Sequence, residues 1–241
     1  QLDSISDRSG WIFTSGIFAS AFPVIPDHPG KIRQFTLEGP LDHLSEHFNK
    51  LRKPSQLSLY SVEQYFNGTD IKSPFRRSGL VIDREVFTVD TDPNYSGKRM
   101  TLGDVILTNG DVPPKYFVTT ESLDRWAYLK GAKNEKRINK ASGFEYKYNE
   151  GSMTFPDPLE KPSRTIITGE GGPTPSRFKH VIRDENGHLR RLTPIELERL
   201  NMFPDNHTEG VTDIKRAFFM GNALVVGIVE QIGRKLVELV K

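Results

Sequence analysis

The sequence contains no cysteine among its 241 residues. Disulfides, thiolate metal ligands and a thiol nucleophile are therefore excluded from this polypeptide. No apolar run approaches the roughly 18 residues that a membrane span needs, and residues 1–10 have neither the basic nor the apolar region of a signal peptide. We expect from these absences a cytoplasmic protein that makes no membrane contact.

An excess of charge of one sign is also lacking. The 33 Lys and Arg residues nearly balance the 31 Asp and Glu residues, and the formal net charge is +2. A role in binding nucleic acid must therefore follow from where the charges lie and not from their sum. With 36% hydrophobic and 10% aromatic residues, the composition is that of a somewhat polar globular protein, with one large domain or two small ones.

Glycine and proline are frequent, which favours short strands and loops over long helices. The apolar residues of 41–51 have helical spacing and predict one short helix, which Pro54 ends. Strand-forming residues over 80–89 predict a hairpin that turns at Asp83 and Arg84. Such a hairpin needs no role beyond a structural one.

Two further helices are predicted near the C-terminus. The first starts with Thr193 as N-cap, Pro194 at the first helical position and Glu196 at the third, which is the pattern of a capping box. The second is expected to begin near Gly221, because apolar residues recur there with helical period. This apolar stripe consists of Val225, Val229, Ile232, Leu236 and Leu239.

Basic residues and glycines gather in two central segments. Between Arg125 and Lys147 seven basic residues exceed two acidic ones by five, which suits a track of phosphates or a solvated lysine-rich surface. Residues 164–180 combine a strand-like run, a glycine-rich loop and further basic residues. The loop matches no nucleotide-phosphate pattern; it fits close approach to a DNA edge or a plain structural turn.

Two C-terminal motifs occur together and in order. Residues 190–200, RRLTPIELERL, with Phe203-Pro204 after them, resemble the ninth motif of the cytosine-5 DNA methyltransferases. Residues 221–226, GNALVV, with Ile232-Gly233, resemble the tenth motif of the same family. Residues 101–104 with 115–117, and residues 162–166, are similar to the target-recognition region of these enzymes. The resemblance is clear from about Thr101 to the end.

The resemblance implies roles for particular residues. The residues after the Gly-Asn pair line the S-adenosylmethionine pocket in that family, so Asn222, Ala223 and Leu224 are expected to bind this cofactor. Arg191, Leu192 and Pro194 are expected to be structural. Thr165 and Ile166 match a Thr-aliphatic pair near the flipped base, and the loop after them is expected to read bases. The expected contacts with double-stranded DNA are Thr165, Ile166, Gly171, Gly172, Ser176, Arg177 and Lys179, with Lys133 and Arg137 on the basic track.

The implied fold is α+β: a small, loop-rich target-recognition domain with short strands, ending in a helix that packs on an absent Rossmann-like catalytic domain. Residues 1–100 would be a linker and the N-terminal part of the small domain. Residues 101–204 would form the target-recognition domain with the ninth motif, and 205–241 would return to the catalytic domain. The apolar stripe should then be an exposed surface that a partner covers.

The family's catalytic motifs are missing from this sequence, namely Phe-x-Gly-x-Gly, Pro-Cys, Glu-Asn-Val and Gln-Arg-x-Arg. In the resembling enzymes a cysteine thiolate adds to carbon 6 of a flipped cytosine, which makes carbon 5 nucleophilic toward the cofactor's methyl group. We therefore expect no catalytic residue here and no activity of the chain alone. A restriction-modification methyltransferase would be completed by a polypeptide with the Pro-Cys motif, as a separate subunit or as the rest of a longer protein.

Two other functions stay open. A DNA-binding module without methyl transfer would show no activity with any Pro-Cys partner. A metal-dependent nuclease is also conceivable, because Glu145-Tyr146-Lys147 matches the Glu-x-Lys half of such a site and Asp124 lies upstream. That spacing is loose, and the histidines show no metal-ligand spacing, so we expect no metal.

Overall fold

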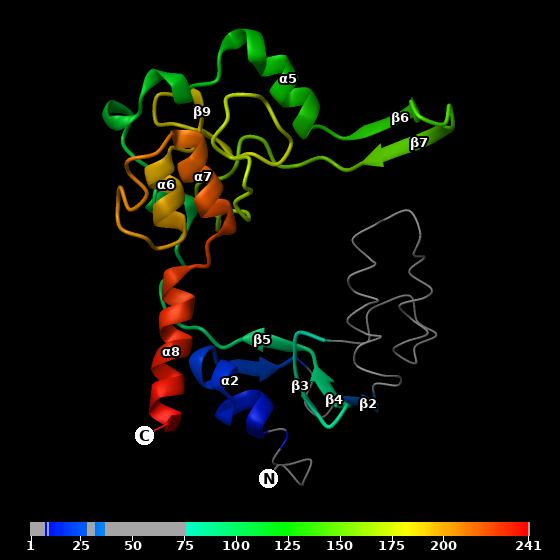
Figure 1. Cartoon of the computed structure of the whole chain (residues 1–241), viewed down its shortest axis with the longest axis vertical. Coiled ribbons are helices and arrows are strands. Elements are labelled where there is room, and N and C mark those ends of the chain that lie inside the picture. Colours follow the sequence, from blue (N-terminus) through cyan, green and yellow to red (C-terminus); the bar gives the residue numbers. More distant parts are fainter. Residues whose placement is uncertain (1–7, 9, 28–31, 37–75, 241) are drawn as a thin grey trace. The chain divides into compact units, whose positions relative to one another are not determined.

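The computed structural model describes residues 8, 10–27, 32–36 and 76–240, and the chain forms two compact units (Figure 1). One unit comprises residues 1–97 with 231–241, and the other comprises 98–230. The helix predicted over 41–51 lies outside the described residues. In the described part of the chain, no helix is long and apolar enough to cross a membrane. The domain boundaries at 100 and 204 stay predictions.

Short antiparallel strands dominate the first unit. Three strands form one sheet in the order β2-β4-β3, and β1 pairs with β5 in a second sheet. Apolar side chains of a helical segment and of the three-stranded sheet share one small core cluster. The elements are η1 (Trp11–Ser15), α2 (Ile17–Ala21), β1 (Val24–Pro26), β2 (Arg33–Thr36), β3 (Ser78–Ile82), β4 (Glu85–Val89) and β5 (Thr91–Pro93).

The hairpin predicted over 80–89 is confirmed as β3 and β4. Leu80 pairs with Phe87, and both side chains are buried. The two turn residues, Asp83 and Arg84, have φ values of 46° and 76°. Positive φ at both central positions is what a type I′ turn requires, and this turn matches the twist of the two strands.

The second unit combines short helices with two separate hairpins. The hairpin of β6 and β7 extends away from α6 and α7 (Figure 1), whereas β8 and β9 pair next to α6 in the sequence. The elements are η2 (Leu102–Asp104), η3 (Asn109–Asp111), η4 (Pro114–Tyr116), α5 (Thr120–Lys130), β6 (Lys133–Ile138), β7 (Glu145–Glu150), β8 (Val181–Arg183), β9 (Leu189–Arg191), α6 (Pro194–Leu200) and α7 (Asp213–Asn222). The mixed helix and strand character with small sheets is as predicted; the packing on a Rossmann-like domain stays a prediction.

The core of the second unit is built from residues far apart in the sequence. Leu102 of η2 and Val105, the residue after η2, pack with Ile182 of β8 and with side chains of α6 and α7. Leu192 and Leu197, on either side of the start of α6, are both almost completely buried in this cluster. The core therefore fixes α6 and α7 against the segment that follows η2.

The start of α6 is confirmed. The Thr193 hydroxyl accepts a hydrogen bond from the Glu196 backbone N–H at 3.3 Å, and the Glu196 carboxylate accepts one from the Thr193 N–H at 2.7 Å. Pro194 occupies the first turn, where its missing N–H costs nothing. The capping box satisfies donors that a helix start otherwise leaves unpaired.

The predicted start of the last helix near Gly221 is wrong. Gly221 and Asn222 instead end α7, and Ala223 is extended with φ −76° and ψ 153°. The last helix, α8 (Val226–Val240), begins four residues after Asn222 in the sequence. Helix α7 itself was not predicted, although Thr212 caps it by accepting the Lys215 N–H at 3.4 Å.

Helix α8 carries the predicted apolar stripe. None of its residues is buried. Val229, Leu236 and Leu239 keep between 47% and 61% of their surface exposed. Burial of this stripe would require a surface that the described chain does not supply.

Candidate functional site

A pocket in the second unit joins segments that the sequence keeps far apart. Its volume is about 310 Å³. Thr165 and Ile166 line it on one side, and the end of α7 with the chain after it lines the other. The complete lining is Ser163, Arg164, Thr165, Ile166, Leu200, Asn201, Met220, Gly221, Ala223 and Val225.

Two glycines hold the 165–172 segment directly against α7. A Cβ atom on Gly221 would lie 2.4 Å from the Thr168 backbone nitrogen and 2.6 Å from the Ile167 carbonyl carbon. A Cβ atom on Gly171 would lie 2.8 Å from the Asp213 carbonyl oxygen. Only glycine permits backbones to approach this closely. The absence of a side chain at Gly221, which lines the pocket, therefore sets the width of the pocket.

Asn201 fixes the other wall of the pocket. It is buried at the C-terminal end of α6, where its Nδ2 donates to the Met220 carbonyl at 2.8 Å. Its own carbonyl accepts the Val226 N–H at 2.9 Å. One residue thereby ties the end of α7 to the start of α8. Asn201 was not among the residues predicted from the sequence.

The three residues expected to bind the cofactor lie in different environments. Ala223 is half-buried, packs on the core and lines the pocket. The Asn222 side chain donates to the Phe218 carbonyl at 2.9 Å and does not line the pocket. Leu224 is 74% exposed. The structure therefore brings only Ala223 together with Thr165 and Ile166.

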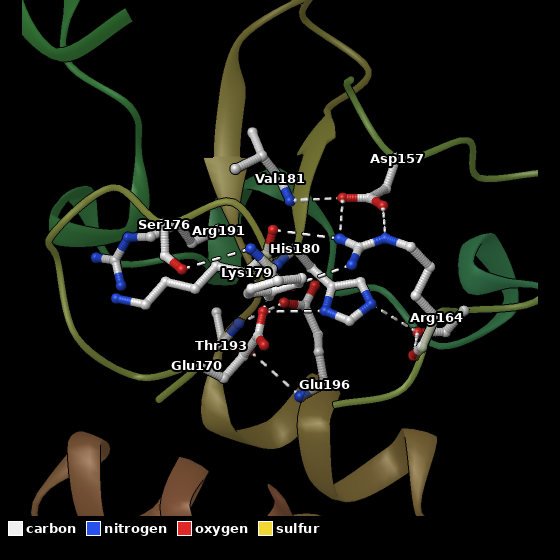
Figure 2. Close-up of polar contacts among 12 residues, drawn as sticks. Asp157, Arg164, Glu170, Ser176, Lys179, His180, Val181, Arg191, Thr193 and Glu196 are labelled. Atoms are coloured by element: carbon white, nitrogen blue, oxygen red, sulfur yellow. Dashed lines mark hydrogen bonds and ion pairs between the residues drawn. The ribbon is translucent and has the colours of Figure 1, made fainter. Parts of the chain in front are cut away.

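An ion pair between half-buried Arg164 and buried Asp157 anchors the segment before Thr165 (Figure 2). The Arg164 guanidinium donates to both carboxylate oxygens of Asp157, at 2.6 and 3.1 Å. Asp157 also accepts the Val181 N–H at 2.9 Å. Burial favours the neutral acid, but the Arg164 and Val181 donors outweigh it and hold the pKa of Asp157 below its usual value. Arg164 also donates to the Phe178 carbonyl at 3.0 Å.

A second buried set of polar groups crosses the glycine-rich loop (Figure 2). The Glu170 carboxylate accepts the His180 backbone N–H and lies 2.9 Å from the His180 Nδ1 atom. The other ring nitrogen, Nε2, lies 3.1 Å from the Ser163 hydroxyl. His180 and Glu170 are almost fully buried. The two ends of the loop are thus fastened to the segment that leads to the pocket.

Lys179 is directed into the loop. Its Nζ donates to the carbonyls of Gly172 and Thr174 at 2.6 and 2.8 Å, and burial lowers its pKa. Arg191 donates to the Gly172 carbonyl at 3.2 Å and to the Lys115 carbonyl at 2.6 Å. Both basic side chains are buried. They stabilise the loop by binding its backbone, and two of the three Lys179 donors are used in this way.

Arg177 and Lys133 share one acidic partner. The Arg177 Nε lies 3.0 Å from Glu150, and the Lys133 Nζ lies 2.8 Å from the same carboxylate. Arg177 also donates to the Leu129 carbonyl at 3.2 Å, and Lys133 is buried. This geometry favours a structural role for both residues, because their donors are already used within the chain.

Arg137 is likewise engaged within the hairpin. Its Nη2 lies 2.6 Å from Glu135, and its guanidinium carbon lies 3.6 Å from the centre of the Tyr148 ring. On the loop, the Ser176 hydroxyl accepts the Phe178 N–H at 3.4 Å, and Gly171 and Gly172 are half-buried. The exposed side chains of the loop include Thr174 and Phe178, which we did not select from the sequence.

Arg191, Leu192 and Pro194 are all buried, next to an ion pair without solvent contact. Arg190 donates to both carboxylate oxygens of Glu196 at 2.7 and 3.0 Å, and both side chains are fully buried. Glu196 also accepts the Leu107 N–H at 2.8 Å. The ninth-motif segment therefore joins β9, the start of α6 and the segment after η2.

The described ranges contain no group of three His, Asp or Glu side chains that could hold a metal ion. Glu145 begins β7, and Asp124 lies within α5.

The sequence matches the family model of the C-5 cytosine-specific DNA methylases over residues 83–238. It is 36% identical over 230 residues to the Type II methyltransferase M.Sau3AI of Staphylococcus aureus, covering 95% of this chain and 48% of that protein. It is 27% identical over 161 residues to the Type II methyltransferase M.HpaII of Haemophilus parainfluenzae, covering 61% of this chain and 40% of that protein.

Among solved structures, the Dnmt2 methyltransferase of S. pombe aligns with a TM-score of 0.42 and 15% identity, over 65% of this chain and 51% of that chain. This chain spans less than half the length of the two curated relatives. The match of the family model covers well over half of the sequence. The chain belongs to the C-5 cytosine-specific DNA methylase family.

Proposed function

We propose that this chain is the DNA-recognition part of a DNA (cytosine-5-)-methyltransferase. It would bind a specific duplex and complete a pocket for S-adenosylmethionine. The nucleophilic cysteine would come from a catalytic part outside this sequence, because the chain has no cysteine. The complete enzyme would transfer the cofactor's methyl group to carbon 5 of cytosine.

The observation that carries this proposal is the pocket with two distinct walls. Thr165 and Ile166, which the family resemblance assigns to the flipped base, share it with Ala223 of the cofactor motif. Methyl transfer requires the base and the cofactor to meet at a fixed distance and angle. A scaffold that joins both walls through Gly221 and Asn201 would set that distance before either ligand binds.

The proposed roles follow from where each side chain lies. Thr165 and Ile166 would contact the flipped base, and the exposed side of the loop near Ser176 would read its neighbours. Arg177, Lys179 and Lys133 would hold that surface in shape, since their donors are used within the chain. The DNA-contact assignment of Gly171 and Gly172 would be limited to their backbones.

The cofactor would be shared between this chain and the catalytic part. The apolar side chains Ile166, Leu200 and Met220 fit one face of a planar ring, and a volume of about 310 Å³ holds a single base or one end of the cofactor. When bound, S-adenosylmethionine supplies the methyl group. Exposed Leu224 and the stripe of α8 would pack on the catalytic part.

Reconstitution tests this proposal. The purified chain would be mixed with a catalytic polypeptide that carries the Pro-Cys motif, with methyl-labelled cofactor and a mixed-sequence duplex. Label should enter the DNA only when both polypeptides are present. Binding of duplex without methylation by any such partner would favour a DNA-binding module; absence of duplex binding would contradict both.

A matched pair of variants tests the pocket. Thr165→Trp places a large ring in the pocket mouth from an exposed position. Thr154→Trp introduces the same ring at an exposed position outside the pocket. We expect Thr165→Trp to lower methylation at least about tenfold, equivalent to about 1.4 kcal/mol, while Thr154→Trp leaves it unchanged. Equal methylation rates for the two variants would contradict a role of the pocket in methyl transfer.

A further inference from the structure

The two faces of the β6–β7 hairpin differ in how their charges are paired. Residues directly opposite each other in an antiparallel pair share a face of the sheet. The register therefore places Lys133, Glu135, Arg137, Tyr146, Tyr148 and Glu150 on one face, the paired face. The other face carries Asn134, Lys136, Asn149 and Lys147, with Ile138 and Glu145 toward the tip; we call the first four residues the lysine face.

The paired face has no free charge. Its two basic side chains bind its two acidic ones, Lys133 with Glu150 at 2.8 Å and Arg137 with Glu135 at 2.6 Å. Arg137 also covers the Tyr148 ring. This face therefore stabilises the hairpin and offers little to an anionic ligand.

The lysine face is built in the opposite way. All four of its residues are exposed. Their side chains form no hydrogen bond or ion pair with any described part of the chain. Lys136 stands directly opposite Lys147, and like charges in this position destabilise a strand pair. The next cross-strand pair is Asn134 with Asn149, which adds two amide groups beside the two ammonium groups.

We propose that the lysine face contacts duplex DNA in its major groove; this inference rests on the proposed function. A two-stranded ribbon fits the major groove, where lysine donates to phosphates or guanine edges and asparagine pairs with adenine edges. A hollow of about 390 Å³ lies along this hairpin; Asn134, Lys136 and Lys147 of the lysine face line it together with Glu135, Glu145 and Tyr146. An anionic groove also removes the repulsion between the two lysines.

The hairpin is positioned to act together with the glycine-rich loop. It extends away from α6 and α7 (Figure 1), and its base is fixed by Glu150, which binds both Lys133 and Arg177. Arg177 belongs to the loop, so one carboxylate ties the loop to the base of the hairpin. Because the loop and the hairpin are already held together, they can contact the same duplex without a further loss of conformational entropy on binding.

The test compares two pairs of lysines with equal charge. Duplex binding by the full chain would be measured over a range of salt concentrations for Lys136→Gln/Lys147→Gln and for the control Lys161→Gln/Lys215→Gln, whose lysines are also exposed. Each phosphate contact contributes roughly 0.9 to the slope of log affinity against log salt. We expect the first pair to reduce the slope by about two and the control to leave it unchanged.

Other outcomes separate this inference from the proposed function. Equal salt slopes for both variants and the unchanged chain would overturn the proposal that the lysine face contacts DNA, but not the proposed methyl transfer. Duplex binding through the lysine face without methylation by any Pro-Cys partner would overturn only the proposed function. Equal binding of single strands, or binding of anionic vesicles or acidic proteins instead of duplex, would overturn the groove assignment.

A second variant tests base contact separately from charge. Asn134→Ala/Asn149→Ala keeps the charge of the lysine face. We expect the salt slope to stay constant while the preference among duplex sequences changes by about fivefold or more, as loss of an adenine contact implies. An unchanged preference would restrict the lysine face to phosphates and contradict the groove contact.

Discussion

Gly221→Ala is the substitution for which the structure gives the sharpest expectation. The added Cβ would lie 2.4 Å from the Thr168 nitrogen and 2.5 Å from the Thr168 Cα. Both are backbone atoms, so no side-chain rotation relieves the overlap. Either the end of α7 or the 167–168 segment must move, and this movement would widen the pocket between Thr165 and Ala223.

Two opposing effects set the size of the change. Alanine favours a helix over glycine by about 1 kcal/mol, which would stabilise the end of α7. Overpacking of a closed contact costs about 1–3 kcal/mol, and rigid backbone partners place Gly221 at the upper end of this range. We therefore expect a net loss of about 1–2 kcal/mol. For a chain of this size that loss lowers Tm by roughly 2–8 °C.

Gly233→Ala provides the matched control. Gly233 also lies in a helix, α8, but a Cβ atom there would meet nothing within 4 Å. We expect this variant to gain about 0.5–1 kcal/mol from helix propensity alone. Urea denaturation followed by circular dichroism would measure both. A Gly221→Ala variant as stable as the Gly233→Ala variant would refute the close backbone contact as the reason for this glycine.

Two further variants test buried charges, and a third, at a partly exposed ion pair, serves for comparison. Glu196→Gln keeps a capping side chain but removes the charge that pairs with Arg190, and we expect a loss of about 3–5 kcal/mol in urea denaturation. Asp205→Asn, which breaks the partly exposed pair with Arg199, should cost at most about 1 kcal/mol; equal costs would contradict the burial argument. Burial lowers the pKa of Lys130 to about 8, so the unfolded chain binds more protons than the folded chain above that pH. Stability should thus gain a contribution between pH 8 and 10 that Lys130→Met lacks, and parallel pH profiles would contradict this.

Features that depend on neighbouring residues were predictable from the sequence. The start of α6 depends on Thr193, Pro194 and Glu196, which lie within one turn. The β3–β4 turn at Asp83 and Arg84 likewise needs only the strand formers on either side. Local donors and local backbone conformations decide both elements, so their residues carry the signal.

Features that depend on contacts between residues far apart in the sequence were not predictable from it. The sequence around Gly221 predicts the start of a helix. A glycine is needed there because the Thr168 backbone, far away in the sequence, leaves no space for a Cβ atom. In the sequence the basic residues between Arg125 and Lys147 form one group, although alternation along β6 separates Lys133 from Lys136. Lys133 faces Glu150, and Lys136 faces another lysine. Only the strand register, which needs both strands, reveals this difference.

The same reasoning explains how a loop without regular secondary structure keeps one shape. Arg191 donates from β9 to the Gly172 carbonyl, Lys179 donates to the same carbonyl, and Arg164 donates to the Phe178 carbonyl. These donors lie beneath the loop or outside it, and they bind its backbone. The shape therefore does not depend on exposed side chains such as Thr174. Because shape and exposed chemistry are set by different residues, the proposed function implies that exchange of the exposed positions would alter base preference while the pocket beside Thr165 keeps its geometry.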